Sequence, residues 1–168
     1  MGWKTFKERF GIKHIVCVDG GNINIGSGYV NDLVKISIES GFVRENETFE
    51  RFLKENYPKL REASQSEILS VIQERDVFGK SITVYTYDDE GIYTKQCEEL
   101  GYPNVTHCGM LMYENKFSTD AEKVKAWFLD NIDIAIKWEQ EHIEKLQREI
   151  AESRVALEKY KQSREKYS

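Results

Sequence analysis

Residues 132–160 read IDIAIKWEQEHIEKLQREIAESRVALEKY, and this stretch decides the fold of the C-terminal part of the chain. It contains neither Pro nor Gly, and its apolar residues recur at alternating steps of four and three. This spacing is a heptad repeat, typical of a helix that packs against another helix in a coiled coil. Ile136, Ile143, Ile150 and Leu157 take the a positions of the heptad. Glu139 and Ser153 interrupt the repeat at two d positions, where they weaken the seam but help to fix its register. The predicted oligomerisation residues are Ile132, Ile136, Ile143, Leu146, Ile150 and Leu157.

The predicted helix is longer than this stretch and covers residues 119–168. It would span ~75 Å at ~1.5 Å per residue, whereas residues 1–118 would form a head only ~28 Å across. Because such a head cannot cover the apolar stripe, we expect the chain to pair with itself as a homo-oligomer. In a parallel pair Glu149 would reach the partner's Arg154, but one pair does not decide the direction, and an antiparallel arrangement stays open.

The head is predicted to be an α+β domain with antiparallel sheet. Apolar spacing and turn signals give the order α-β-β-β-α-α-β-β-β, followed by the long helix. The glycine-rich turn at residues 19–22 joins two strands, and the third strand is expected at 30–38. The sixth strand is expected at 105–113. Thr119 and Glu122 have the spacing of a capping box for the long helix.

Composition argues against several classes of function. The net charge is −5, and neither the head nor the helix has the basic surplus that nucleic-acid binding requires. No apolar run is long enough to cross a membrane, and residues 1–10 lack the apolar core of a signal peptide. Because no export signal is found, we expect a cytoplasmic protein whose three cysteines are reduced thiols.

Motifs for metal, nucleotide or nucleophilic chemistry are weak. The glycine-rich segment 19–28 lacks the Lys-Ser/Thr pair of a phosphate loop. The Cys and His spacings do not match a zinc site, so no metal or other cofactor is predicted. His107 and Cys108 are adjacent, and on a strand their side chains would point to opposite faces. A small enzyme that uses Cys97, Cys108 or a carboxylate in a cleft remains an alternative.

Tyrosines crowd the second half of the head. Tyrosine offers a large contact area and a hydroxyl at low entropic cost, which suits a binding surface. Cross-strand aromatic packing would explain the same pattern. The predicted binding residues are Tyr85, Tyr87, Tyr93 and Tyr102.

The stretch CEELGYPNVTHCGMLMYENKFST, residues 97–119, precedes the long charged helix. Together they resemble small uncharacterised phage-encoded accessory proteins. The resemblance implies an accessory role, and such proteins often inhibit host defences. We therefore expect a homo-oligomeric binding protein without catalysis, whose target is a host protein or a small signalling ligand. A structural or assembly factor that acts through the coiled coil is a second alternative.

Overall fold

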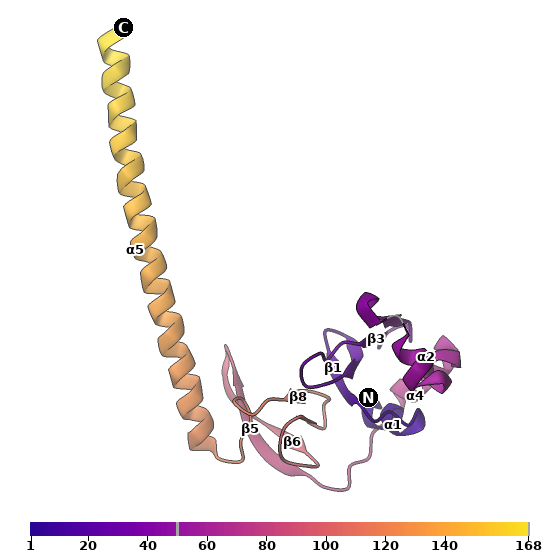
Figure 1. The fold of residues 1–168 in the computed structure, drawn as a ribbon. Helices are drawn as coiled ribbons and strands as arrows, with labels where there is room; N and C mark the ends of the chain where they lie inside the picture. The colour runs from indigo at the N-terminus through magenta and orange to yellow at the C-terminus, as the bar shows by residue number, and fades with distance from the viewer. Residues whose placement is uncertain (50, 168) are drawn as a thin grey trace. The chain divides into compact units, whose positions relative to one another are not determined.

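The computed structural model describes residues 1–49 and 51–167 (Figure 1). The chain divides into two compact units, Met1–Lys125 and Ala126–Ser168. The first unit is an α+β domain with antiparallel sheets, and the second is helical, as the sequence predicts. Across the described residues, no helix combines the length and the apolar character that crossing a membrane requires.

A four-stranded antiparallel meander forms the N-terminal part of the first unit. Its strands are β1 (Ile15–Asp19), β2 (Asn22–Gly26), β3 (Val34–Ser37) and β4 (Val43–Glu45), and each pairs with the next. Gly20 and Gly21 form the β1–β2 turn at φ 54° and 76°, values that only glycine adopts at little cost. The predicted hairpin is therefore confirmed.

The third strand is shorter than predicted, and β4 was not predicted. The segment after Gly26 folds back on that residue so closely that a Cβ there would overlap Val30 O. Ser27 N donates to the same oxygen at 2.7 Å, which makes a tight turn in place of extended backbone. The prediction of a strand over 30–38 is wrong at its start, because this turn delays pairing until Val34.

Short helices cover one side of this sheet: α1 (Trp3–Arg9), α2 (Phe52–Asn56), α3 (Pro58–Glu62) and α4 (Gln65–Gln73), with the 3-10 turn η1 (Glu47–Phe49). Their apolar residues and the inward face of the sheet form one core, in which Phe6, Ile23 and Ile36 are fully buried. Ser64 Oγ accepts from Glu67 N at 3.2 Å and caps α4, as its sequence spacing predicts.

The second half of the first unit contains β5 (Ile82–Asp88), β6 (Gly91–Cys97), β7 (Asn104–Val105) and β8 (Leu111–Met112). β5 and β6 pair along their whole length, whereas β7 and β8 are two residues each. The prediction of one strand over 105–113 is wrong. Gly109, at φ 92°, reverses the chain and packs so close to Val18 that a Cβ would overlap that side chain. Its carbonyl oxygen accepts from Val18 N at 2.7 Å.

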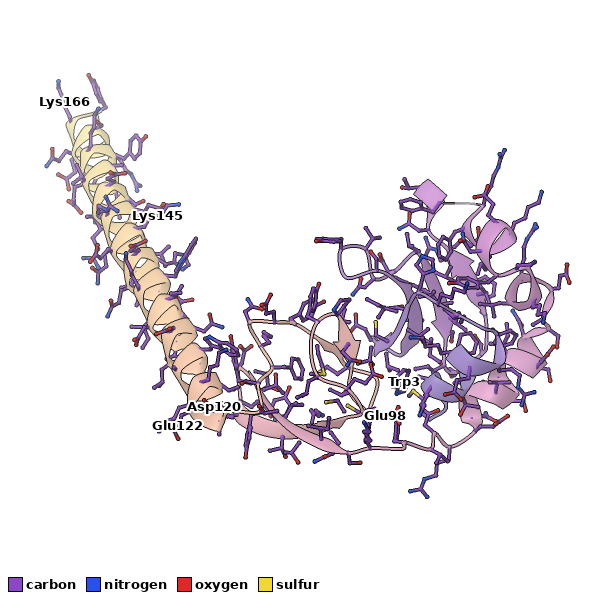
Figure 2. All side chains as sticks on the ribbon, turned by 60° about the horizontal axis from the view of Figure 1, so that its bottom comes forward. Trp3, Glu98, Asp120, Glu122, Lys145 and Lys166 are labelled. Carbon is purple, nitrogen blue, oxygen red and sulfur yellow. The ribbon has the colours of Figure 1, made fainter. Side chains whose placement is uncertain are left out.

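The long helix α5 spans Ala121–Tyr167. Asp120, rather than Thr119, caps it, because Asp120 Oδ1 accepts from the backbone N–H groups of Glu122 at 2.9 Å and Lys123 at 3.3 Å. Figure 2 labels Asp120 and Glu122 at this end of the helix. Val124 is fully buried in the first unit, so the division between the units falls inside the helix and not at its first residue.

Candidate functional site

The structure does not gather the four predicted binding tyrosines into one cluster. Tyr85 and Tyr87 share one face of β5, whereas Tyr93 lies opposite Thr86 on the other face of the β5–β6 hairpin. Tyr87 is mostly buried, with Lys116 Nζ 5.4 Å from its ring centroid. Tyr102 belongs to the connector between β6 and β7. These positions make Tyr102 the member best placed to meet a ligand.

A cavity of about 380 Å³ lies beside Tyr102 in the first unit. Tyr102 and Tyr113 line it with stacked rings whose centroids are 5.9 Å apart. A volume of this size falls within the range of small-molecule sites. The other lining side chains combine an apolar floor with polar groups at the margin: Val84, Leu100, Met112, Phe117, Glu114, Ser118, Thr119 and Lys123.

The position of Tyr102 is fixed from a distant part of the chain. Its hydroxyl donates to Gly28 O at 2.8 Å. A Cβ on Gly28 would lie 2.7 Å from that hydroxyl oxygen, so the glycine leaves room for the ring. Burial, followed by the nearby Cys17, Tyr102 and Asp19, raises the pKa of Tyr113, which therefore stays protonated at neutral pH. The cavity thus presents two stacked phenol rings, and the ring of Tyr102 is held by the loop that follows β2.

The floor of the cavity belongs to a small core of its own. Val84, Cys97 and Met112 are buried there, and Phe117 packs against them. Tyr85 N donates to Ser118 O at 2.8 Å and Ser118 N donates to Tyr85 O at 3.2 Å, which ties the segment before α5 to β5. No local sequence pattern predicts this cavity, because its wall joins residues of the β6–β7 connector, β8 and the start of α5.

Cys108 lies among polar groups on the surface of the same unit. Its side chain is exposed, and its Sγ is 3.2 Å from Thr106 Oγ1. Burial alone would raise the pKa of Cys108, but hydrogen bonds with Thr106 and Met110 N and the positive charge of Lys95 together lower it. Lys95 Nζ also lies 5.2 Å from the ring centroid of Tyr93. This thiol is therefore more readily ionised than an ordinary cysteine.

The other two cysteines are buried. Burial, with a contribution from Asp19, raises the pKa of Cys17 to about 11, and burial raises the pKa of Cys97. Both thiols therefore stay protonated and poorly reactive. Cys97 belongs to the small core under the cavity, so the structure gives it a packing role.

His107 and Cys108 do not lie on a strand, so the predicted reason for their separation is wrong. Both belong to the turn between β7 and β8. His107 Nε2 is within 3.0 Å of Lys80 O, and its ring stacks on Phe78 with centroids 3.8 Å apart. Within residues 1–49 and 51–167, no group of three His, Cys, Asp or Glu side chains is arranged to hold a metal ion.

A second cavity, of about 340 Å³, lies between α1 and the β6–β7 connector. Lys4 Nζ and Glu98 Oε2 form an ion pair at 2.8 Å on its rim, and Gly79 N donates to Glu98 Oε1 at 2.6 Å. Figure 2 labels Glu98 and Trp3, which both line this cavity. Because the charged groups of Lys4 and Glu98 on this rim already bind each other, this cavity is a weaker candidate for a ligand.

The predicted seam of α5 is exposed along its whole length. Ile136 and Ile143 are 50% and 52% exposed, and Leu157 is 53% exposed. Between Ala126 and Tyr167 no side chain is buried. Charged residues form intrahelical ion pairs beside the stripe, such as Lys145 with Glu149 at 3.8 Å. Lys145 and Lys166 extend outward from α5 (Figure 2).

No protein-family model, curated protein or solved structure matches the chain.

Proposed function

We propose that this chain is a homo-oligomeric binding protein in which α5 joins the copies and the head binds a small ligand in the Tyr102–Tyr113 cavity. The proposal assigns no catalytic step to the cavity. The protein that we propose is cytoplasmic. Sequestration of a signalling ligand of a host defence, as an accessory protein of a phage, is the role that this proposal favours.

The exposed apolar stripe of α5 is the observation that carries the proposal. Six aliphatic side chains of the stripe are between 37% and 53% exposed: Ile132, Ile136, Ile143, Leu146, Ile150 and Leu157. Burying one such side chain stabilises an assembly by ~1.5–3 kcal/mol when it is fully covered. Monomeric proteins rarely expose so long a continuous apolar surface, and a regular heptad repeat is suited to another helix.

The cavity supports a small ligand over a protein target. It is concave and has two aromatic rings, an apolar floor and a few polar groups, which is the usual composition of a small-molecule site. A planar group stacked against Tyr102 or Tyr113 would gain the dispersion that aromatic contacts supply. Lys123 and Glu114 at the margin would favour a ligand that carries polar substituents.

Two aspartate substitutions test the assembly. Ile143→Asp puts a charge into the proposed seam, where an unpaired buried charge costs several kcal/mol. Val155→Asp makes a similar change on the opposite face of the same helix, where the side chain is 73% exposed. Light scattering should show dissociation of the first variant only. Equal masses for wild type and both variants would remove the support for a seam.

A second candidate function, a thiol enzyme, is favoured by the environment of Cys108. Its thiol is exposed, lies beside Lys95 and has a lowered pKa. Both candidates can be separated by Cys108→Ser and Tyr102→Ala. A binding protein loses its biological activity with Tyr102→Ala and keeps it with Cys108→Ser, whereas a thiol enzyme loses it with Cys108→Ser.

A further inference from the structure

We infer that two copies of α5 pair antiparallel, with Ile143 of one chain opposite the partner's Leu146. This inference rests on the homo-oligomer proposed above and adds the direction and register of the two helices. It follows from the positions of the polar residues in the exposed stripe and from the charges on both sides of it. The partner that we propose for this surface is a second copy of the same helix.

The polar d residues argue against a parallel pair. In a parallel, in-register pair every seam residue faces its own copy. Glu139 would then face the partner's Glu139, which places two carboxylates against each other at a partly dehydrated seam. Ser153 would face the partner's Ser153 and leave a layer without an aliphatic side chain. Two of the central layers would thus weaken the pair.

In an antiparallel pair each a residue faces a d residue of the partner. With Ile143 opposite the partner's Leu146, Glu139 faces the partner's Ile150 and Ser153 faces the partner's Ile136. Each layer between Leu129 and Tyr160 then contains at least one aliphatic side chain, and no carboxylate faces its own copy. Outside these layers Lys125 faces the partner's Arg164, so the proposed seam ends at Leu129 and Tyr160. From the outside inward, the layers are Leu129 with the partner's Tyr160, Ile132 with the partner's Leu157, Ile136 with the partner's Ser153, Glu139 with the partner's Ile150, and Ile143 with the partner's Leu146.

The flanking charges are complementary in this register. In an antiparallel pair, e residues such as Asp133 and Arg154 lie beside e residues of the partner. Likewise, g residues such as His142 and Glu149 lie beside g residues. Asp133 thus lies near the partner's Arg154, and His142 near the partner's Glu149; the two-fold symmetry makes each pair occur twice. Moving one helix by a heptad in one direction places Glu149 beside the partner's Glu149. Moving it in the other direction places Asp133 beside the partner's Gln147 and loses the ion pair with Arg154, so the intermediate register has the better charge pairing.

The length of the helix agrees with the same register. α5 spans Ala121–Tyr167, and the register places Glu122 opposite the partner's Tyr167. In this register the exposed part of the helix, from Ala126 onward, overlaps with the partner's up to residue 163. The N-terminal ends of the second units, at Ala126, would lie ~55 Å apart at ~1.5 Å per residue. A parallel pair would bring them to within ~10 Å.

Disulfide trapping distinguishes the two directions. Ile132→Cys and Leu157→Cys are each introduced into full-length Cys108→Ser chains, which leaves only the two buried native cysteines. The chains are oxidised separately and after mixing with subunit exchange. The mixed sample should form a disulfide between Cys at 132 and Cys at 157, and each variant alone should stay unlinked. Linking of each variant to itself would establish a parallel pair and overturn the inference.

A charge-swap series tests the register independently. Arg154→Glu should weaken the dimer about five-fold, because two exposed ion pairs of ~0.5 kcal/mol each are lost. Adding Asp133→Arg should restore the wild-type dissociation constant, whereas adding Glu149→Arg should not. If Glu149→Arg restored the dimer of the Arg154→Glu variant and Asp133→Arg did not, Glu149 would pair with the partner's Arg154, as in a parallel dimer.

The molar mass of the same samples separates this inference from the proposed function. A mass of 19.7 kDa for the unmodified chain would refute the homo-oligomer itself. A doubled mass with self-linked variants, or with neither link formed, would refute only the antiparallel register.

Discussion

The hydroxyl of Tyr102 donates a hydrogen bond to the carbonyl oxygen of Gly28 at 2.8 Å, although 74 positions separate the two residues in the chain. The bond joins the connector between β6 and β7 to the loop that follows β2. It therefore holds one wall of the proposed ligand cavity against that loop. A substitution at either residue should alter the cavity and leave the head folded.

Tyr102→Phe should reduce stability only modestly and weaken ligand binding. The substitution removes one hydrogen bond, which contributes ~0.5–1.5 kcal/mol, and keeps the ring. Denaturant unfolding measures the first effect, and ligand titration the second. Because the ring would lose its anchor to Gly28, a variant with unchanged affinity would show that the anchor has no part in binding.

Gly28→Ala should displace Tyr102 without unfolding the head. The new Cβ would lie 2.7 Å from the Tyr102 hydroxyl oxygen, and a terminal ring can move where backbone cannot. Gly79→Ala is the matched control, since its Cβ would meet its nearest atom, Glu98 Oε1, at an ordinary 3.6 Å. In solution NMR, the chemical shifts of the Tyr102 and Tyr113 ring protons should change in Gly28→Ala and stay unchanged in Gly79→Ala.

Glu98 should make stability depend on pH in the acid range. A hydrogen bond from Lys4, opposed by partial burial and assisted by Gly79 N–H, lowers the pKa of Glu98 from 4.5. A lowered folded-state pKa contributes stability above the unfolded-state value, and this contribution is lost as pH falls through the folded-state pKa. The ion pair contributes ~1 kcal/mol at neutral pH.

Glu98→Gln should therefore flatten the loss of stability below pH 4.5, whereas Glu99→Gln removes the same formal charge at the next residue and should leave it in place. Urea unfolding at several pH values measures both. Identical profiles of unfolding free energy against pH for the two variants would show that the Lys4–Glu98 pair does not contribute to the pH dependence of stability.

Cys108 should be the thiol that iodoacetamide modifies first. It is exposed and has a lowered pKa, whereas Cys17 and Cys97 are buried and have raised pKa values. The rate should reach its half-maximum at a lower pH than for an ordinary cysteine. Lys95→Met should move that midpoint upward, because it removes a positive charge that favours the thiolate. Lys116→Met, which removes a cation beside Tyr87, serves as the control.

Local patterns in the sequence predicted the elements whose signals lie within a few residues. The Gly20-Gly21 turn, the Ser64 cap and the heptad of α5 each depend on neighbouring positions, and the structure has the turn, the cap and the helix. Pairing of α5 with a second copy stays a prediction. The interpretation of residues 105–113 as one strand failed because Gly109 packs against Val18, a contact between distant parts of the chain.

Sequence patterns could not predict the candidate cavity either, because its walls also come from distant parts of the chain. Tyr102 could be chosen as a binding residue from composition, but its neighbour Tyr113 and its anchor at Gly28 are brought to it by the tertiary fold. Alternation on β5 correctly separated Val84 from Tyr85, and only the pairing with β6 shows that Tyr93 lies on the face of Val84. Long-range packing, rather than propensity, decides which tyrosines meet.

Sedimentation equilibrium of the full-length chain at micromolar concentration tests the central claim most directly. Because the apolar stripe of α5 is exposed from Ile132 to Leu157, the account predicts a mass of twice 19.7 kDa or more. A single species of 19.7 kDa across the concentration range would contradict it.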